Sequence, residues 1–498
     1  MTAGQSGVAE WDQSEKAICD KILHLWIADY NDYNPFFDRQ RLVTDFLQDR
    51  QWTAAEIAHF TKQNRTPLTI NIMRNYARQV SGMQRMSRTD IKVEPVDQRN
   101  DPQMAQLAYK TLRWIGYSNR QDRVNSRVFE DGLSGMGVHH IYVKDSKVKI
   151  GCARRYSTVF DSQSVDPLLT DCHRASYTIY LTANQIRDRW KEKAGHLLFT
   201  RDEYERWHED VSSMLMDVNQ SGAPYLVEKR QDRYAVILYE ERANKSRLMV
   251  VTPQGDVQGE FNYPAETAPM FEQMSDGQFR VVPISRECIH SQVILPYYYQ
   301  VIADDWMPYN TFSFVPFVSS RFNCPIPECS SYNFAGIGLQ REKNMRRSNQ
   351  IEALVRSLRG GGVITGPQGA AEAFKKEMES HGHEIGRVYM AGTGVVYTPF
   401  TPPQVLEALR EDEQSAVQDM ERVYGVTAGQ NFGGIDQKGE SGIHRQLRKE
   451  ESQTTLFPIL DDFNEALSLV ALTALDRFVA FAKPPLVFNI TGDDGNPQ

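Results

Sequence analysis

The order of segments in the last third of this chain constrains its fold more than any single motif does. A helical pattern from about Leu339 to Arg359 leads into the glycine-rich stretch GGGVITGPQG, a short helical piece, AAEAFKKEMES, and a β-like run, GRVYMAGTGVVYTPF. Pro402-Pro403 then opens a second helix, to about Tyr424, because proline fits the first turn of a helix. This order predicts two helices joined by a small α/β insert.

Glycine dominates the segment that follows the second helix. Residues 425–442 contain six glycines in eighteen positions, and glycine reaches positive φ at little cost. A last helical pattern runs from Ile443 to about Ala482 and includes Pro458. It would be about 60 Å long at the α-helical rise before any kink. We therefore expect a deformable loop followed by a long helix that Pro458 interrupts.

The first two thirds of the chain mix helices with strands, which is typical of the α+β class. Residues 1–65 are predicted to be helical, with an amphipathic run at Ser14–Tyr30 and then a polar segment around Phe36–Gln51. The next predicted elements, in order, are a helix at Arg74–Arg85, a short strand at Ile91–Pro95, a helical block at 102–134, and a mostly β region from Gly137 to Val250 with a helix near Ala183–Lys193.

Composition excludes several classes of protein. At 498 residues the chain is long enough for two or more domains, and 41% hydrophobic and 24% charged residues are ordinary for a globular protein. It has no apolar run long enough to span a membrane and no secretory signal pattern at its start, so we expect folding in a cytosol. The net charge of −8 disfavours a static DNA binder, although it is compatible with a protein along which DNA slides.

Cysteine and histidine offer two weak metal candidates. The six cysteines do not form a disulfide framework, and Cys324 and Cys329, the only close pair, have no further soft ligands at zinc spacing. We interpret them as ordinary thiols. His381 and His383 could chelate a metal as a pair, but their polar, glycine-flanked surroundings favour a solvated loop. We expect no metal and no cofactor.

The two helices that flank the insert carry opposite charge. Residues 339–359 include the basic side chains Arg341, Lys343, Arg346, Arg347, Arg356 and Arg359 against two acids. Residues 404–424 include the acids Glu407, Glu411, Asp412, Glu413, Asp419 and Glu421 against two arginines. Each helix also has a narrow apolar stripe. Such helices can pack side by side, including around a ring, or they can be two solvated surface helices.

The order of these parts resembles that of phage portal proteins, in which a stem helix, a clip, a second stem helix, a channel loop and a long wing helix follow one another. Gln340-REK-Asn344-MRR-Ser348 is similar to a Gln-xxx-Asn-xxx-Ser pattern in the first stem helix, and Val423-Tyr424-Gly425-Val426-Thr427 with Glu440-Ser441-Gly442 is similar to the passage around the channel loop. Pro67-LTI-Asn71-IMRNYARQVS-Gly82-M-Gln84 and Glu130-DGLSGMGVHHIYV resemble wing segments of the short-tailed-phage branch.

The resemblance extends from about residue 50 to 470, and it implies a division of the chain. It implies a wing at 1–337, helical first and then mixed α/β, a first stem helix at 338–359, a clip at 360–402, a second stem helix at 403–424, a channel loop at 425–442, and a kinked helix with wing and small crown at 443–498. It also implies a structural virion protein rather than an enzyme. Its partners would be itself, in a ring of twelve copies, sequence-independent double-stranded DNA, terminase, head–tail adaptor or tail proteins, and the major capsid protein, with no membrane. It would reside at the capsid portal vertex, and in the host cytoplasm during assembly.

The same resemblance assigns residues to three sites. The DNA-channel loop would contain Gln430, Asn431, Phe432, Gly433, Gly434 and Lys438, although this segment alone could be an ordinary surface loop. The stem helices would pair through Arg341, Arg346 and Arg347 with Glu407, Glu411 and Glu413. Clip docking would use Lys375, Lys376, Glu377 and Glu379.

Three other interpretations of the sequence are considered. An enzyme is disfavoured because the chain has no phosphate-binding G-x-x-x-x-G-K-[ST] loop, no dinucleotide fingerprint, no G-x-S-x-G elbow and no H-E-x-x-H helix. Another virion connector or tail protein is the alternative structural function, but such chains are usually shorter and lack this series of segments. A non-viral ring-forming scaffold is not excluded by the sequence.

Overall fold

The structure is a computed structural model of the chain, and it divides into two compact units. It describes residues 13–63, 65–87, 91–94, 102–191, 227–228, 233–254, 257–260, 265–275, 278–298, 300–320, 323–359, 362–381, 390, 392–399, 405–425 and 442–481. Unit 1 comprises Met1–Gln40, Met83–Ser331 and Ile459–Gln498, and unit 2 comprises Arg41–Gly82 and Tyr332–Pro458.

Helices and strands are both abundant, so the predicted α+β class is confirmed. The helices are α1 (Gln13–Leu47), α2 (Ala54–Lys62), α3 (Met73–Met86), α4 (Pro102–Asn119), α5 (Gln121–Ser134), α6 (Ala183–Arg189), α9 (Ala268–Met274), α10 (Ile337–Arg359), α11 (Gln368–His381), α12 (Val405–Tyr424) and α13 (Gly442–Phe481). The strands are β1 (Met136–Lys144), β2 (Lys147–Cys152), β3 (Thr158–Phe160), β4 (Arg174–Thr182), β5 (Val227–Glu228), β6 (Arg233–Val251), β7 (Val257–Glu260), β8 (Arg280–Leu295), β9 (Gln300–Trp306), β10 (Phe314–Val318), β11 (Gly362–Thr365) and β12 (Val396–Pro399).

Unit 1 is built on two antiparallel sheets. The larger has the strand order β3-β4-β6-β8-β9, and β5 and β7 also pair with β6. Strands β6 and β8 form a long ribbon, in register from Ile237↔Ile294 to Val251↔Arg280. The smaller sheet has the order β10-β1-β2. The recorded strand pairs of both sheets are antiparallel, so neither needs a parallel crossover, and β10 pairs with β1 although the two are far apart in the sequence.

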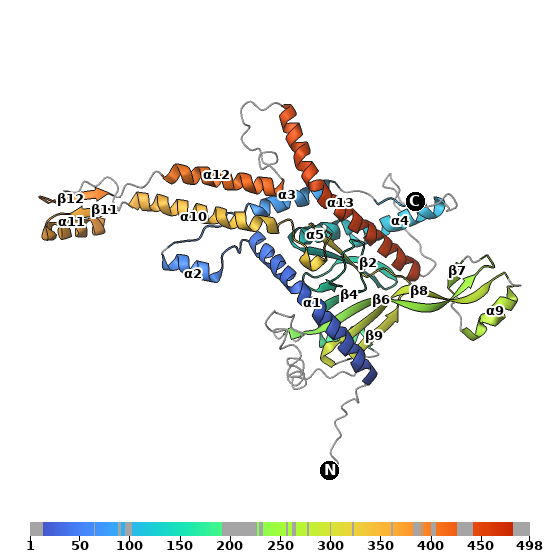
Figure 1. Cartoon of the computed structure of the whole chain (residues 1–498). Helices are drawn as coiled ribbons and strands as arrows, with labels where there is room; N and C mark the ends of the chain where they lie inside the picture. Colours follow the sequence, from blue (N-terminus) through green and yellow to red (C-terminus); the bar gives the residue numbers. More distant parts are fainter. Residues whose placement is uncertain are drawn as a thin grey trace, which may run out of the picture. The chain divides into compact units, whose positions relative to one another are not determined.

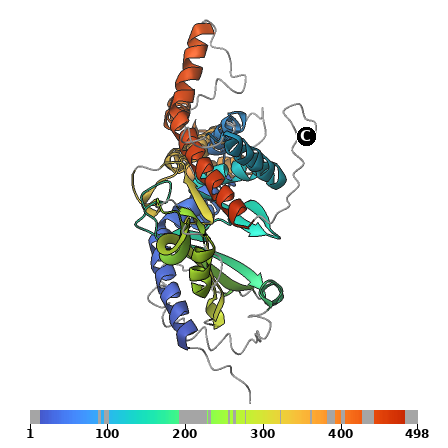
Figure 2. The same cartoon turned by 90° about the vertical axis from the view of Figure 1, so that its right-hand side faces the viewer.

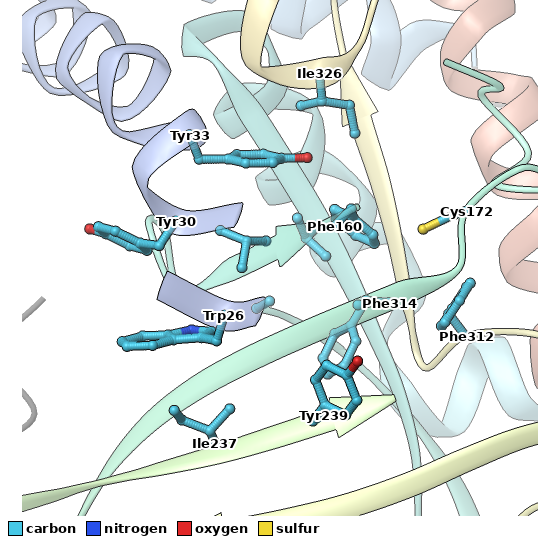
Figure 3. Close-up of a cluster of buried hydrophobic side chains, with 14 of the residues drawn as sticks. Trp26, Tyr30, Tyr33, Phe160, Cys172, Ile237, Tyr239, Phe312, Phe314 and Ile326 are labelled. Carbon is cyan, nitrogen blue, oxygen red and sulfur yellow. The ribbon is translucent and has the colours of Figure 1, made fainter. Parts of the chain in front are cut away.

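Helix α1 covers the larger sheet with an aromatic stripe. Its buried side chains recur three or four residues apart, which places them on one face: Cys19, Ile22, Leu23, Trp26, Tyr30, Tyr33 and Phe37. They join Phe160, Ile237, Tyr239 and Phe314 of the strands in one hydrophobic cluster (Figure 3). Figures 1 and 2 show α1 lying along these strands from two directions. This packing fixes the first helix of unit 1 on its sheet.

Two predictions about the N-terminal region were wrong. Helices were expected over residues 1–65, and α1 and α2 lie there, but the segment after Tyr30 that was expected to be polar buries Phe36 and Phe37, which are 2% and 0% exposed. Pro35 lies inside α1; it removes one backbone hydrogen bond, which the packing of the flanking aromatic side chains compensates. Residues 91–94 form no strand within the described part of the chain, because no neighbouring strand there pairs with them.

The end of α13 is anchored in unit 1 by a fully buried arginine. Arg477 is 0% exposed and donates to the Thr311 carbonyl and to Ser313 Oγ, at 3.0 and 3.1 Å. Glu240, 3% exposed, accepts from the Ser313 backbone N–H at 2.7 Å. Burial raises the pKa of Glu240 and lowers that of Arg477. The hydrogen bonds compensate for removing this guanidinium from water.

Unit 2 contains the helix–insert–helix series predicted from the sequence. The helix predicted at 339–359 is α10 and the one predicted at 403–424 is α12, and the two lie side by side (Figure 1). Between them, the predicted short helical piece is α11, and β11 and β12 form a two-stranded sheet. The β-like run is shorter than expected, since only Val396–Pro399 pairs within the described residues. Helix α13 continues through Pro458, which was expected to interrupt it.

No helix in the described part of the chain is long and apolar enough to cross a membrane.

Candidate functional site

The most elaborate polar arrangement in unit 2 is a ladder of buried side chains on one face of α10. Gln340, Asn344 and Ser348 are spaced four residues apart and are 0%, 1% and 6% exposed. Residues four apart in an α-helix lie on the same face. Opposite them runs the segment 65–72, which leads into α3 and forms neither helix nor strand.

Each rung of the ladder holds the backbone of that segment. Ser348 Oγ accepts from the Leu68 N–H, Asn344 Oδ1 from the Ile70 N–H, and Gln340 Oε1 from the Ile72 N–H, each at 3.1 Å. Gln340 Nε2 also donates to the Ile70 carbonyl at 2.7 Å. The pairing is antiparallel, because the residue numbers rise along the segment while they fall along the helix.

The spacing of the rungs explains why this pattern works. Four helical residues advance about 6 Å along the helix axis, and two residues of an extended segment advance about 6.5 Å. Every second N–H of the segment therefore meets every fourth residue of α10. Backbone groups that are buried without partners cost free energy, so the ladder replaces the partners that a sheet would supply.

The polar atoms of the rungs are themselves satisfied by further contacts. Asn344 Nδ2 donates to Gln51 Oε1, and Gln51 Nε2 donates to the Phe46 carbonyl at 2.9 Å. Ser348 Oγ donates to the Asn344 carbonyl at 2.8 Å. A fully paired buried network of this kind rigidifies its surroundings. The ladder thus joins α10, the end of α1 and the segment before α3 within unit 2.

Three tyrosines lock the end of α12 to the start of α10. Tyr332 Oη donates to the Tyr424 carbonyl at 2.6 Å, and Tyr424 Oη donates to the Asn333 carbonyl at 3.3 Å. The Tyr76 ring stacks on Tyr424, with ring centroids 5.0 Å apart. Burial raises the pKa of all three hydroxyls, which therefore remain protonated. A Cβ at Gly336 would lie 2.1 Å from the Tyr424 hydroxyl, so this close approach requires glycine.

The tyrosine cluster lies immediately before the glycine-rich segment. Gly425 ends α12 with φ +61°, a left-handed conformation that glycine adopts at helix C-termini. The predicted loop residues Gln430, Asn431, Phe432, Gly433, Gly434 and Lys438 lie outside the described residues. The first attachment point of the predicted loop is thus rigid.

Three basic residues of α10 have partners outside α12. Arg341 forms an ion pair with Glu56 of α2 at 2.6 Å, Arg346 pairs with Glu342 one helical turn away at 2.5 Å, and Arg347 donates to Gln350 at 2.5 Å. The side chains of Glu407, Glu411 and Glu413 lie outside the described set. Pairing between the two helices therefore stays a prediction.

The insert between the two helices presents charge on α11. Phe374, 6% exposed, packs near the Tyr397 ring of β12, so the helix covers one face of the small sheet. Lys375, Lys376 and Glu379 are exposed and Glu377 is half-buried. Lys375 and Glu379 lie 3.6 Å apart in an ion pair that water screens. The insert thus carries exposed charge of both signs, and its role in docking stays a prediction.

The described residues offer neither a large cavity for a small molecule nor a metal-binding cluster. Two cavities in unit 1 have volumes of about 40 and 20 Å³, enough for water but not for a typical ligand. No cluster of three or more metal-ligating side chains occurs among the residues searched. Cys324 and Cys329 lie close together, but no third ligand joins them there.

Sequence reasoning missed the central residues of this site. Gln340, Asn344, Ser348 and Tyr424 served only to support a resemblance, and Tyr76 and Tyr332 were not selected. The ladder had a readable signal, namely three hydrogen-bonding side chains at four-residue spacing on an otherwise amphipathic helix. The tyrosine cluster had none, because its members come from segments far apart in the sequence.

Comparison with known proteins gives one match over most of the chain. A family model described as Phage P22-like portal protein matches residues 25–498. A search of curated proteins finds no match. The matched range contains the ladder, the tyrosine cluster, the insert and the glycine-rich segment.

Proposed function

The chain belongs to the P22-like phage portal protein family, and we propose that twelve copies form the ring through which the viral genome passes. As a member of this family it is a structural protein of the virion, located at the capsid vertex, and it serves in the packaging and ejection of double-stranded DNA. During assembly we place it in the host cytoplasm. The observation that carries the proposal is the family match from residue 25 to 498.

Helices α10 and α12 would form the stem of each subunit. The ladder and the tyrosine cluster support this assignment because they hold α10 and the end of α12 rigidly within unit 2. A channel wall must keep its shape while DNA moves past it. The wing would comprise residues 1–337 and the kinked helical part 443–498, and it would contact the major capsid protein.

The glycine-rich segment 425–442 would be the channel loop. Only Asp436, Lys438 and Glu440 are ionic there, so phosphates would meet neither a strong trap nor a uniform barrier. Firm phosphate contacts add salt-dependent affinity, which would slow translocation. Polar side chains and backbone groups at Gln430, Asn431 and Phe432 would touch DNA without reading bases.

The insert at 360–402 would be the clip, which docks terminase during packaging and adaptor or tail proteins afterwards. Lys375, Lys376, Glu377 and Glu379 on α11 would provide the charged docking surface, and the three exposed side chains among them support it. We further propose that the protein has no catalytic activity of its own. The small size of its described cavities is consistent with a structural function.

Stiffening the loop tests the channel assignment. Replacing Gly433 and Gly434 together by valine removes the freedom of both residues to adopt positive φ, so we expect rings to form but DNA packaging or retention to fall. The matched control is Gly82→Val in α3, where an added Cβ meets nothing within 4 Å. Encapsidated genome per particle is the measurement. Variant rings that package and retain a full genome like the parent would contradict the assignment of 425–442 to the constriction.

A further inference from the structure

A pair of cysteines in unit 1 has no part in the functions described above. The Sγ atoms of Cys324 and Cys329 lie 3.3 Å apart, and no disulfide joins them. Sulfur atoms in a disulfide lie about 2.05 Å apart, so a small movement of either side chain would allow a bond. Cys329 is 1% exposed and Cys324 is partly exposed.

A short 3₁₀ turn brings the two thiols together. Ile326–Glu328 forms this turn, with Pro325 before it and Cys329 after it, both in extended conformations with ψ near 150°. The Cys329 thiol points back across the turn, with the Pro325 carbonyl 3.4 Å and the Cys324 carbonyl 3.6 Å from its Sγ. The backbone therefore aims both side chains at the inside of the same turn.

The turn is held in place from three directions. Ile326, 1% exposed, belongs to the main hydrophobic cluster together with Tyr33 (Figure 3). Arg39 Nη2 donates to the Pro327 carbonyl at 2.8 Å and to the Cys329 carbonyl at 3.3 Å. A backbone bridge between Ser320 and Ser330 closes its base. Groups held at reacting distance in this way have little entropy left to lose when they react.

The other four cysteines are placed differently. Cys19, Cys172 and Cys288 are buried, and burial raises the pKa of Cys19 to about 12 and that of Cys172 to about 11. Cys152 is partly exposed like Cys324, but burial and the neighbouring Asp131 carboxylate raise its pKa to about 12. Only thiolates attack disulfides, and no second cysteine is recorded in contact with any of these four in the part of the chain that the structure covers.

We propose that Cys324 and Cys329 form a reversible intramolecular disulfide, with a low-molecular-weight disulfide such as oxidised glutathione as the oxidant. The accessible Cys324 thiolate attacks one glutathione sulfur and releases one glutathione thiolate. The Cys329 thiolate then attacks Cys324 Sγ in the mixed disulfide and releases the second. Two cysteine thiols lose two electrons and two protons, and one oxidised glutathione becomes two reduced molecules.

The surroundings of the protein decide which form is present. A glutathione pool as reducing as that of a cytosol keeps such pairs as thiols, whereas an extracellular medium allows the bond. The bond would close the turn covalently in particles outside the cell. This proposal does not depend on the subunit number or on the channel assignment.

The test uses the full-length protein and its tryptic peptide 322–341, which contains Cys324, Cys329 and no other cysteine. The protein is incubated with oxidised glutathione, its free thiols are alkylated in denaturant, and the peptide is weighed. We expect the peptide to be unalkylated and lighter by two hydrogens than the reduced form. It should regain both alkyl groups after reduction, while the peptides with the other four cysteines are alkylated before and after oxidation.

Two variants separate an internal bond from simple oxidation. Cys329→Ser should leave Cys324 as a stable glutathione adduct, because nothing completes the exchange, whereas the matched control Cys152→Ser should leave the internal bond intact. The proposal is overturned if the parent peptide stays fully alkylatable, carries glutathione at Cys324, or is cross-linked to a second chain. The peptide masses of the parent decide the question even if a variant folds poorly.

Discussion

At the scale of single residues, the α10 ladder shows how an amide side chain can take the place of a neighbouring strand. Asn344 joins four groups, since its amide accepts from the Ile70 N–H and Gln340 and donates to Gln51, while its carbonyl accepts from Ser348. Removing such a residue leaves buried partners unpaired, which costs about 1–3 kcal/mol for each group. The ladder should therefore tolerate substitution poorly at its middle rung.

Asn344→Ala should lower the free energy of unfolding of unit 2 by roughly 2–4 kcal/mol, because the Ile70 N–H and the Gln51 amide lose their partner. The matched control is Asn349→Ala on the exposed side of the same helix, where Asn349 accepts only from Arg65. Denaturant unfolding gives the free energy, and hydrogen exchange at Ile70 gives the local effect. Equal losses in the two variants, or an Ile70 amide that stays protected in Asn344→Ala, would contradict the ladder.

One buried histidine, His139, and one half-buried histidine, His140, predict acid sensitivity of unit 1. Burial lowers the pKa of His140 to about 4, with a smaller contribution from Arg477, and burial lowers that of His139 to about 3. The two histidines thus become protonated at lower pH in the folded form than in the unfolded form, where histidine titrates near 6.5. This contribution to stability is complete above pH 6.5 and is lost as the pH falls towards 4 for His140 and towards 3 for His139.

His140→Phe should remove part of that sensitivity without emptying its site, since His140 already stacks on Phe314 at 4.8 Å. Between pH 8 and pH 5 the parent should lose about 2 kcal/mol more unfolding free energy than the variant. Glu240, whose raised pKa acts in the opposite direction, is present in both proteins and cancels in the difference. Urea titrations at the two pH values provide the measurement. If the parent and the variant lose the same unfolding free energy between the two pH values, the pKa of His140 is not lowered in the folded protein.

At the scale of elements, the sequence predicted long helices well and failed where tertiary packing overrides local rules. The α10 and α12 patterns are regular and end at glycines or prolines, so both helices could be placed within a few residues. Pro458 was expected to interrupt the last helix, yet it lies inside α13, and Pro35 likewise lies inside α1. Proline removes only one hydrogen bond, and packing of α1 against the sheet outweighs that loss.

The functional elements were predictable in order but not in their contacts. The resemblance to portal proteins rested on collinear segments, and the family match confirms it. The polar ladder depends on residues almost three hundred positions apart meeting in space, as Ser348 and Leu68 do. Charge patterning suggested acids of α12 as partners for Arg341, which stays a prediction, but it did not suggest the ion pair that Arg341 forms with Glu56 of α2. Local sequence cannot rank such distant partners.

Charge reversal tests whether α10 and α12 also pair, within a subunit or between neighbours. Arg346→Glu and Glu413→Arg should each weaken ring assembly, and the double variant should recover it, because the pair is then restored with opposite signs. A single exposed pair contributes only about 0.2–1 kcal/mol, but a ring repeats it in every subunit. The ring fraction as a function of salt concentration is the measurement. If the double variant assembles no better than the worse single variant, Arg346 and Glu413 do not pair with each other.

At the scale of the whole molecule, the chain passes between its two units four times. Three of the passages lie within helices α1, α3 and α13, and two of them coincide with Gly82 and Pro458. Both residue types weaken a helix. Unit 2 contains the two stem-like helices and the insert, and unit 1 contains both larger sheets. The parts that we assign to the channel and to docking thus share one compact unit.

The central claim is that this protein is a portal subunit whose α10 and α12 surround a DNA channel. Cryo-electron microscopy of the purified assembly, viewed along its symmetry axis, tests it most directly. We predict a closed ring of twelve subunits, with α10 and α12 around a central channel and residues 425–442 at its narrowest part. A ring with these helices on its outer rim, an assembly without a central channel, or a chain that remains monomeric at every concentration and salt condition would contradict the account.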